Sequence, residues 1–312
     1  MKVLVTGSTG FVGHAVAAEM VDRGHQVVGV TRTIESALPP GVARFRGDIS
    51  RVEDLTEALS GVDAVCHLAA RTRARESISD PLGFWTTNVG GTLTLLRAML
   101  TVGTTRLVLA STCAVYGQAD HQPLDESAPE VPANPYGESK LAADRSVLDV
   151  AATGAIGAVI LRPCNAAGAS HGRTDHDTSR LIPGVVAALR SPSAEVVIDG
   201  DGDSIRDFVH VADVADAFAL SLDSCSPGTV RTYNIGSERK TSVLDVIEVA
   251  ERASGNVIRR RHGPEAPGPR ELRADSSRIR AELGWRPRRS SLERILGDVL
   301  DADRRAARDR AL

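Results

Sequence analysis

Three glycines near the N-terminus place the strongest constraint on what this chain can fold into. The sequence opens as Met1-Lys-Val-Leu-Val-Thr-Gly-Ser-Thr-Gly-Phe-Val-Gly13, so glycines follow the apolar run Val3 to Val5. That run predicts a buried parallel strand, and the pattern through Met20 predicts a helix. Glycines at this spacing let the turn tighten, let the backbone approach a pyrophosphate and let the helix pack against the strand. Glycines also serve plain turns, so the rest of the chain must decide. The residues expected to cradle a dinucleotide pyrophosphate at the helix N-terminus are Gly7, Gly10, Phe11, Val12 and Gly13.

Strands and helices alternate through the first half of the chain. Apolar runs predict further strands over 26–30, 42–46, 62–68 and 106–110, and helices over 52–59, 84–99 and 135–153. Strands separated by helices of this length pair in parallel through right-handed crossovers. We therefore expect an α/β fold, a doubly wound parallel sheet of the Rossmann type with a smaller C-terminal α/β substrate domain.

The second half of the chain has a different rhythm. Beyond Pro163 regular strands cease, and helices are expected over 179–189, 211–222 and 243–253. A chain of 312 residues is long enough for a doubly wound domain and a second, smaller one. We expect the dinucleotide-binding domain to comprise 1–163 and about 206–236. The substrate-binding domain would comprise 164–205 and 237–312, with the active site between the two.

The end of the second expected strand bears on which dinucleotide binds. In Rossmann folds this position carries an Asp or Glu that binds the adenosine ribose, whereas an Arg nearby accommodates the 2′-phosphate of NADP. Here the chain reads Thr31-Arg32, without a carboxylate. Arg32 favours NADP, but it is equally a solvated loop residue beside a ribose held by backbone. The choice between NAD and NADP therefore stays open.

Other strand ends are expected to contact the dinucleotide, because open α/β sheets bind ligands at their carboxyl edge. Asp48 can hydrogen-bond the adenine amino group or, alternatively, cap the next helix. In His67-Leu-Ala-Ala70, small residues let the backbone lie against the cofactor. The remaining predicted contacts are Ile49, Leu68, Ala69, Ala70, Asn88, Ser111 and Pro163.

Tyr136 and Lys140 are the candidate catalytic pair. They lie four residues apart in Pro135-Tyr-Gly-Glu-Ser-Lys140, so on a helix they share one face. A phenol has a pKa near 10, but an ammonium one turn away and a cationic nicotinamide both favour the phenolate. Tyr136 can then act as base or acid on a hydroxyl, with Thr112 of Ser111-Thr112 as a hydrogen-bonding partner to the same oxygen. An ordinary surface Tyr and Lys is the alternative, since this spacing is common. Both residues are also expected to contact the cofactor.

These motifs together resemble the extended short-chain dehydrogenase/reductase family, and within it the nucleotide-sugar epimerases and dehydratases. The resemblance covers essentially the whole chain and is most similar to the UDP-glucose 4-epimerase pattern. It continues through Leu161-Arg-Pro-Cys-Asn-Ala-Ala-Gly168, Leu181-Ile-Pro183, Gly200-Asp-Gly-Asp-Ser-Ile-Arg-Asp-Phe-Val-His210 and Tyr233-Asn-Ile-Gly236.

The resemblance implies that tightly bound NAD or NADP takes and returns a hydride, while Tyr136, Lys140 and Thr112 act on the sugar hydroxyl. It implies that Asn165 and Arg206 contact the diphosphate, for which a guanidinium is chemically apt. It also implies a homodimer formed through the helices that carry Phe84 and Tyr136. The substrate-binding set expected for the nucleotide sugar is Arg71, Thr112, Cys113, Asn165, Leu181 and Arg206.

Three positions depart from the family pattern. Thr31-Arg32 replaces the expected Asp. Cys113-Ala114 stands where the 4,6-dehydratases carry an Asp-Glu acid and base, and Ala114 cannot act as a base. Two roles stay open for Cys113. It is either the acid of a dehydration or a small buried packing residue, and we favour the second role. Ala266 stands where a phosphate-binding Arg is expected, so either Arg270 takes over or that end of the substrate is unusual.

Several polar segments have plain structural interpretations. Arg71 to Ser77 carries three arginines, of which one is expected to meet a substrate phosphate or carboxylate while the others are solvated. The loop His171 to Thr178 fits no zinc spacing, so we expect no metal. Arg259 to His262 is expected on an exposed strand, and the tail from Arg304 is expected to fray.

Composition excludes other partner classes. The net charge of −3 gives no reason to expect nucleic acid or an anionic membrane. Four scattered cysteines suit a reducing cytoplasm, and no apolar run of about 18 residues predicts a membrane span.

We thus expect a cytoplasmic isomerase that epimerises a nucleotide-activated sugar, at C4, through a keto-sugar. The alternatives are a dehydratase with Cys113 as acid, an NADPH-dependent keto-sugar reductase, and a dinucleotide sensor without catalysis. A sensor needs no phenolate, so Tyr136, Lys140 and Thr112 argue against that last alternative.

Overall fold

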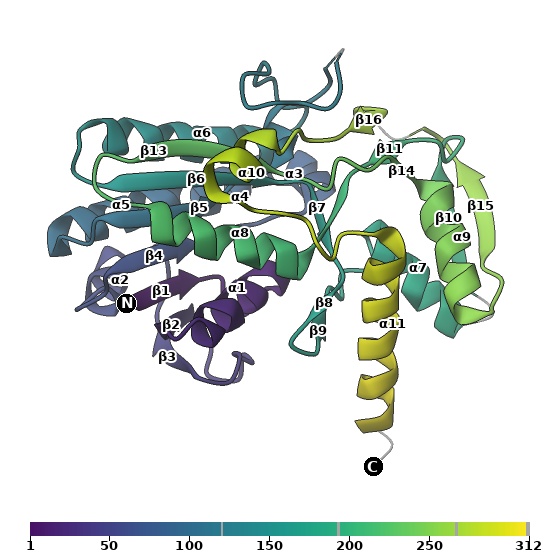
Figure 1. The fold of residues 1–312 in the computed structure, drawn as a ribbon, viewed down its shortest axis with the longest axis horizontal. Helices are drawn as coiled ribbons and strands as arrows, with labels where there is room; N and C mark the ends of the chain where they lie inside the picture. Colours follow the sequence, from purple (N-terminus) through teal and green to yellow (C-terminus); the bar gives the residue numbers. More distant parts are fainter. Residues whose placement is uncertain (120, 192–193, 266–267, 310–312) are drawn as a thin grey trace.

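A seven-stranded parallel sheet forms the larger part of the molecule (Figure 1). The sequence predicts the parallel sheet and five of its strands, but not the strands over 157–163 and 230–235, the second of which lies beyond the point where regular strands were expected to cease. The computed structural model describes residues 1–119, 121–191, 194–265 and 268–309. The strand order is β13-β6-β5-β4-β1-β2-β3. Strands β2 and β3 therefore extend the sheet on one side of β1, and the later strands extend it on the other side, beginning with β4. These strands are β1 (Lys2–Thr6), β2 (Gln26–Thr31), β3 (Val42–Arg46), β4 (Ala64–His67), β5 (Arg106–Ala110), β6 (Gly157–Pro163) and β13 (Val230–Ile235).

Helices cover both faces of the sheet because its strands are apolar on both sides. On one face, Val3 and Val5 of β1 pack with α1 (Phe11–Asp22) and α8 (Val211–Ser224). On the other face, Leu4 packs in a second cluster with residues of three helices. These are α2 (Val52–Ala58), α5 (Gly91–Val102) and α6 (Pro135–Ala152).

A second part of the molecule lies beside the carboxyl end of the sheet and has its own apolar core (Figure 1). Its core residues come mainly from α7 (Leu181–Arg190), α9 (Val243–Ser254) and α11 (Leu292–Asp309). The strands β10 (Glu195–Asp199) and β15 (Arg259–Gly263) pair in parallel at its outer side, and the arginines of β15 are exposed as predicted.

Short elements connect the two parts. The strand β11 (Ile205–Arg206) pairs with β14 (Thr241–Ser242) and β16 (Glu271–Leu272), and β12 (Phe208–His210) pairs with β7 (Asn165–Ala167). The remaining short elements are α3 (Ala74–Ser79), α4 (Pro81–Phe84), η2 (Cys113–Val115), β8 (Ala169–Ser170), β9 (Arg173–Thr174) and α10 (Ser277–Leu283).

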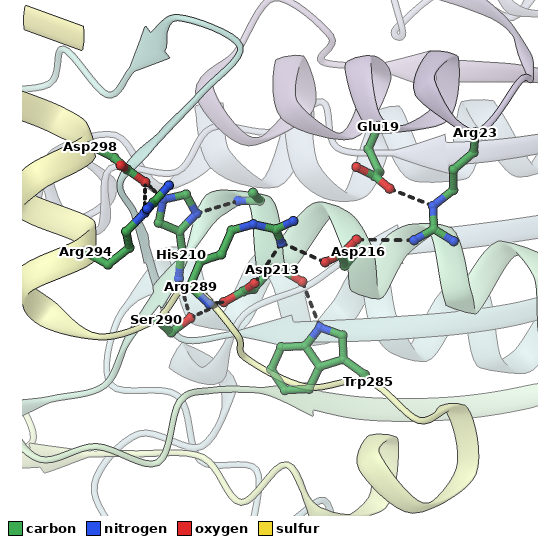
Figure 2. A network of polar contacts seen from close by, with 11 residues as sticks. Glu19, Arg23, His210, Asp213, Asp216, Trp285, Arg289, Ser290, Arg294 and Asp298 are labelled. Carbon is green, nitrogen blue, oxygen red and sulfur yellow. Dashed lines mark hydrogen bonds and ion pairs between the residues drawn. The ribbon is translucent and has the colours of Figure 1, made fainter. Parts of the chain in front are cut away.

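A buried polar network ties the last segment of the chain to the sheet (Figure 2). The Asp213 carboxylate, which is fully buried on α8, accepts hydrogen bonds from Ser290 Oγ at 2.7 Å and from the Arg289 backbone N–H at 2.8 Å. Ser290 Oγ in turn accepts from the His210 backbone N–H at 2.8 Å. Trp285 donates its indole N–H to the Asp213 carbonyl. The network therefore fixes where α11 leaves the sheet part.

One expectation about helices was wrong. The predicted helix over 84–99 is interrupted by a π-helical turn, η1 (Trp85–Gly90), which separates α4 from α5. The tail that was expected to fray from Arg304 is helical as far as Asp309, where α11 ends, and its last residues, 310–312, lie outside the described residues. Among the described residues, none of the helices has both the length and the apolar character that a membrane crossing requires.

Candidate active site

A cleft of about 2230 Å³ runs along the carboxyl edge of the sheet, between the sheet and the second part of the molecule. It lies at the topological switch point, where doubly wound sheets bind ligands. Nearly all the residues predicted for the site line this cleft, although they come from many separate segments. They are Gly7, Gly10, Phe11, Val12, Gly13, Arg32, Asp48, Ile49, Leu68, Ala69, Ala70, Arg71, Ser111, Thr112, Cys113, Tyr136, Lys140, Pro163, Asn165, Leu181 and Arg206.

The glycine turn is built for close backbone approach. Gly7 has a φ of +71°, a backbone conformation that residues with a side chain rarely adopt. A Cβ on Gly13 would lie 2.0 Å from the Gly7 carbonyl oxygen, so α1 can pack here only with glycine. Gly10, which precedes α1, has no side chain to cap the helix. The first N–H groups of α1 thus remain available to an anion, and the turn fits a dinucleotide pyrophosphate.

The edge of the cleft at β2 carries the cation Arg32. Arg32 is exposed, and Thr31 beside it is buried. Asp48 faces this edge, where hydrogen bonds from Ser50 and the charge of Arg32 lower the pKa of its carboxyl. Asp48 is not the N-cap of α2, because Arg51 holds that position. Its carboxylate therefore lies on the cleft wall, as the predicted contact with the adenine amino group requires.

A buried chain of polar groups shapes the wall formed by Leu68 and Ala69. Both backbone N–H groups donate to Thr6 Oγ1 at 3.1 Å. Thr6 Oγ1 also lies 2.7 Å from His67 Nδ1. Burial, with a smaller effect of the Lys140 charge, lowers the pKa of His67 to about 3. A neutral His67 thus orients this wall, a role that the sequence motif did not reveal.

Thr112 and Tyr136 approach each other from opposite sides of the cleft floor. Asn134 caps α6 by accepting from the Gly137 N–H at 3.0 Å, which places Tyr136 in the first turn. Burial raises the pKa of the Tyr136 phenol, and the neighbouring Thr112 side chain opposes part of this rise. The Tyr136 ring packs edge-on against Phe84, with centroids 6.3 Å apart. The phenol is therefore held in one orientation, facing the cleft.

Lys140 lies one turn further along α6 and is 4% exposed. Burial lowers the pKa of its ammonium to about 8. Within the described residues its Nζ forms no hydrogen bond, and Asp144 acts on it only through its charge. A buried ammonium without a bonded partner requires one, so Lys140 fits the hydroxyl groups of a dinucleotide ribose.

Behind this pair is a carboxylate that the sequence analysis missed. Asp144, four residues after Lys140 and fully buried, accepts a hydrogen bond from Ser111 Oγ at 2.8 Å. Arg162 donates to the same Asp144 oxygen at 3.1 and 3.2 Å, and the other oxygen has no partner among the described residues. The four-residue spacing could have indicated Asp144, but its link to Ser111 depends on packing.

Asn88 is the predicted cofactor residue that does not line the cleft. It is 1% exposed in the π-helical turn η1. Its side chain donates to Ser139 Oγ at 2.9 Å and exchanges hydrogen bonds with the Arg71 backbone. Asn88 thus joins η1, α6 and the loop after β4, a supporting position often found at π turns near functional sites.

The arginines of the cleft differ in how far their charge is already paired. Arg71 pairs with Glu76 and Asp80 and stacks over Phe84, 4.5 Å from the ring centroid. Arg270 pairs with Asp201 at 2.6 Å, and Ala266 lies outside the described residues. By contrast, Arg206 has no carboxylate in ion-pair distance within the described part of the chain, and burial lowers its pKa.

Contacts across the cleft mouth were also missed from the sequence. Arg73 of the loop after β4 pairs with Asp177 at 2.9 Å, and Arg180 donates to Thr72 Oγ1 at 2.9 Å. These residues join the sheet part to the segment before α7, where Leu181 is partly buried. Among the described residues, His, Cys, Asp and Glu side chains nowhere gather in a group that could hold a metal ion.

Comparison with known proteins gives one consistent result. Residues 3–236 match the model of the NAD dependent epimerase/dehydratase family. The chain is 37% identical to UDP-glucose 4-epimerase of Streptomyces lividans, over 93% of each protein. It is 34% identical to the Corynebacterium glutamicum enzyme of the same name, over 96% of this chain and 94% of that protein. A crystal structure of UDP-glucose 4-epimerase from Stenotrophomonas maltophila with NAD and formylated UDP-arabinopyranose superposes with a TM-score of 0.91, at 31% identity over 99% of each chain.

Proposed function

The chain belongs to the NAD dependent epimerase/dehydratase family, and on that premise we propose that it epimerises a nucleotide-activated sugar at C4. The observation that carries this proposal is that Thr112 and Tyr136 lie together in the cleft, with the Lys140 ammonium, which forms no hydrogen bond within the described residues, one turn away. This is the arrangement needed to remove and return a hydroxyl proton.

Tyr136 takes the proton of the sugar 4-hydroxyl and later returns it, while Thr112 holds the same oxygen by a hydrogen bond. The Lys140 ammonium lowers the free energy of the phenolate electrostatically. When bound, the nicotinamide supplies a hydride acceptor that later returns the hydride to the sugar, so no net redox change occurs. Between the two hydride transfers the keto-sugar must rotate so that its other face receives the hydride. A cleft of about 2230 Å³ leaves room for this rotation.

The dinucleotide fits the glycine turn and the wall of Leu68 to Ala70, and we propose NAD as the resident form. The related Stenotrophomonas structure contains NAD. A reaction without net redox change also needs no particular cellular reductant. Arg32, exposed at the end of β2, leaves room for a 2′-phosphate, so NADP is expected to bind as well.

Arg206 is the proposed anchor for the substrate diphosphate. It lines the cleft, is partly buried, donates to the Ile205 carbonyl and lacks a carboxylate partner within the described residues. A buried guanidinium gains most from a phosphate, which it can bind in bidentate fashion. Arg71 and Arg270 are weaker candidates because carboxylates already pair them. We propose a UDP-sugar, which agrees with the ligand of the Stenotrophomonas enzyme.

We also propose that the chain forms a homodimer through the helices predicted for it. Large apolar side chains are exposed along the segment from α4 to α5. Exposed apolar side chains gathered in one place are typical of a protein–protein interface. They are Leu82 (78%), Trp85 (41%), Leu93 (44%) and Leu100 (49%).

A dehydratase is less well supported. The Cys113 thiol donates to the Arg162 carbonyl at 3.1 Å, so its proton is engaged inside the protein. Ala114, the next residue, offers no base. An NADPH-dependent reductase remains a separate outcome that cofactor consumption would identify.

The test is to incubate purified protein with UDP-, TDP- and GDP-sugars and to follow the anomeric signals by NMR. We expect the C4 epimer to form without loss of water and without net consumption of NADPH. Tyr136→Phe should reduce kcat by about 10²- to 10⁴-fold. Tyr233→Phe is the matched control, because its hydroxyl bonds Glu282 away from the cleft. The proposal is wrong if no sugar epimerises, or if Tyr136→Phe matches the control. Mass spectrometry of the dinucleotide released on denaturation would separate NAD from NADP.

A further inference from the structure

Two thiols meet at the floor of the active-site cleft. Cys113 and Cys164 are 51 residues apart in sequence, yet their sulfur atoms lie 3.2 Å apart. Cys113 is 1% exposed, whereas Cys164 is partly exposed, and both line the cleft. The other two cysteines, Cys66 and Cys225, are buried in the sheet core. The catalytic chemistry proposed above uses neither Cys113 nor Cys164.

We propose that Cys113 and Cys164 are an oxidisable pair, and that a peroxide converts them into a disulfide that disables the active site. A disulfide bond is about 2.04 Å long, so the sulfur atoms need to approach by only about 1.2 Å. Neither cysteine lies within a strand of the sheet. Cys113 begins the short turn η2, and Cys164 stands between the ends of β6 and β7. The Cys164 backbone N–H donates to the Ile235 carbonyl of β13 at 2.9 Å, so the approach of the two sulfur atoms requires movement mainly at Cys113.

The chemistry balances with one peroxide per pair. The Cys164 sulfur, which is reached from the cleft, attacks one peroxide oxygen, the O–O bond breaks, and hydroxide leaves to become water. The resulting sulfenic acid is attacked by the Cys113 sulfur, the S–O bond breaks, and a second water leaves. Two thiols lose two electrons in total and hydrogen peroxide gains them. A dithiol reductant reverses the step by exchange.

The thiolate is the reacting form, so the surroundings of Cys164 set the rate. The hydrogen bond to Cys113, with burial, raises the pKa of the Cys164 thiol well above its ordinary value. Oxidation is therefore expected to be slow at neutral pH and to accelerate as the pH rises.

The effect on catalysis follows from the neighbours of the pair, and this part rests on the proposed function. Thr112 immediately precedes Cys113 and is the side chain that acts on the Tyr136 phenol. Pro163, on the cleft wall, immediately precedes Cys164. Because a misplacement of about 1 Å can reduce a rate about 10²-fold, the disulfide should lower kcat by a similar factor.

The experiment treats the full-length reduced protein with hydrogen peroxide and counts thiols after denaturation. We expect the count to fall from the four cysteines of the chain to two, and to recover with dithiothreitol. Tryptic digestion separates the two sites, because Cys113 falls in peptide 107–140 and Cys164 in peptide 146–173. Mass spectrometry should find these two peptides linked. Four free thiols after treatment, or a link between other cysteines, would overturn the proposal.

Two variants separate this modification from general damage. Cys164→Ala should form no such link and should retain its own untreated activity after peroxide. Cys225→Ala, at a buried site far from the cleft edge, should still form the link and lose activity as the wild type does. If Cys164→Ala is inactivated by peroxide as fast as the wild type, the pair is not the switch. Thiol counts and peptide links do not depend on activity, so failure of the proposed function would leave this result interpretable.

Discussion

Asp144 accepts a hydrogen bond from the Ser111 hydroxyl at 2.8 Å, and this bond joins the first half of the active site to the second. Ser111 immediately precedes Thr112, while Asp144 lies on α6, one turn beyond Lys140. Arg162 of β6 forms an ion pair with Asp144 at 3.1 Å. The result is a buried carboxylate that holds the cleft floor together and attracts the Lys140 ammonium.

Replacing Asp144 should change the ionisation of Lys140. The Asp144 charge raises the pKa of the Lys140 ammonium against the larger lowering by burial, so Asp144→Asn should move that pKa below about 8. The chain has only three lysines, Lys2, Lys140 and Lys240, so ε-carbon NMR can follow Lys140 directly. The alkaline limb of kcat/KM should move to lower pH by the same amount. Asp149→Asn, an exposed change on the same helix, should move neither.

Burial of the charged Lys140 ammonium should lower the free energy of unfolding of the protein. Its pKa is about 8 in the folded chain against 10.5 in the unfolded chain, so below pH 8 the fold carries a buried ammonium. Lys140→Met should therefore be inactive but more stable at pH 7 by up to about 3 kcal/mol. Because the unfolded chain binds more protons between pH 8 and 10.5, the wild type should recover this difference as the pH rises. Urea unfolding of the cofactor-free proteins measures it, and a gap independent of pH would contradict the assignment.

Substitutions at Gly13 and Gly10 should have different effects. A Cβ at Gly13 would clash with the Gly7 carbonyl at 2.0 Å, so Gly13→Ala should cost about 3 kcal/mol in the free energy of unfolding. A Cβ at Gly10 would meet only the Gly7 carbonyl, at 3.3 Å. Gly10→Ala should therefore leave the melting temperature almost unchanged and weaken dinucleotide binding instead. Calorimetry of folding and of NAD binding distinguishes the two, and equal melting losses would refute this division.

The network of Figure 2 should contribute to stability through its buried carboxylate. Asp213→Ala leaves Ser290 and the Arg289 N–H without their acceptor, which should cost about 1–3 kcal/mol. Arg294→Ala removes an ion pair with Asp298 whose arginine is 62% exposed, and should cost less than about 1 kcal/mol. Denaturant midpoints of the two variants provide the comparison. Equal losses would show that burial does not govern this network.

The proposed homodimer makes a prediction about surface charge. Leu93→Glu places a carboxylate among the exposed apolar side chains of α5, so light scattering should give the mass of one chain instead of two. Val257→Glu is the matched control, because Val257 is 86% exposed in the second part of the molecule. A wild type with the mass of a single chain would refute the proposal, as would a Leu93→Glu protein that stays dimeric.

Local patterns were enough to predict most of the framework. The glycines at 7, 10 and 13 predict the phosphate turn because strand, turn and helix follow one another directly in the chain. Tyr136 and Lys140 share a face through helical geometry alone. Alternating strands and helices predict the parallel sheet, since few connections are possible. The π-helical turn at 85–90 was not predictable in this way, because the apolar spacing around it does not differ from that of an α-helix.

The amino-acid sequence by itself thus determined the fold class, the glycine turn and the face that carries Tyr136 and Lys140, all of which depend on near neighbours. Only the tertiary structure decided which distant groups meet. Asp144 reaches Ser111 across 33 residues, and Cys164 reaches Cys113 across 51. It also decided that Arg71 forms ion pairs with carboxylates, whereas Arg206 forms none within the described residues. The physical reason is that burial, pKa and ion pairing depend on packing between segments, which residue spacing along the chain does not specify.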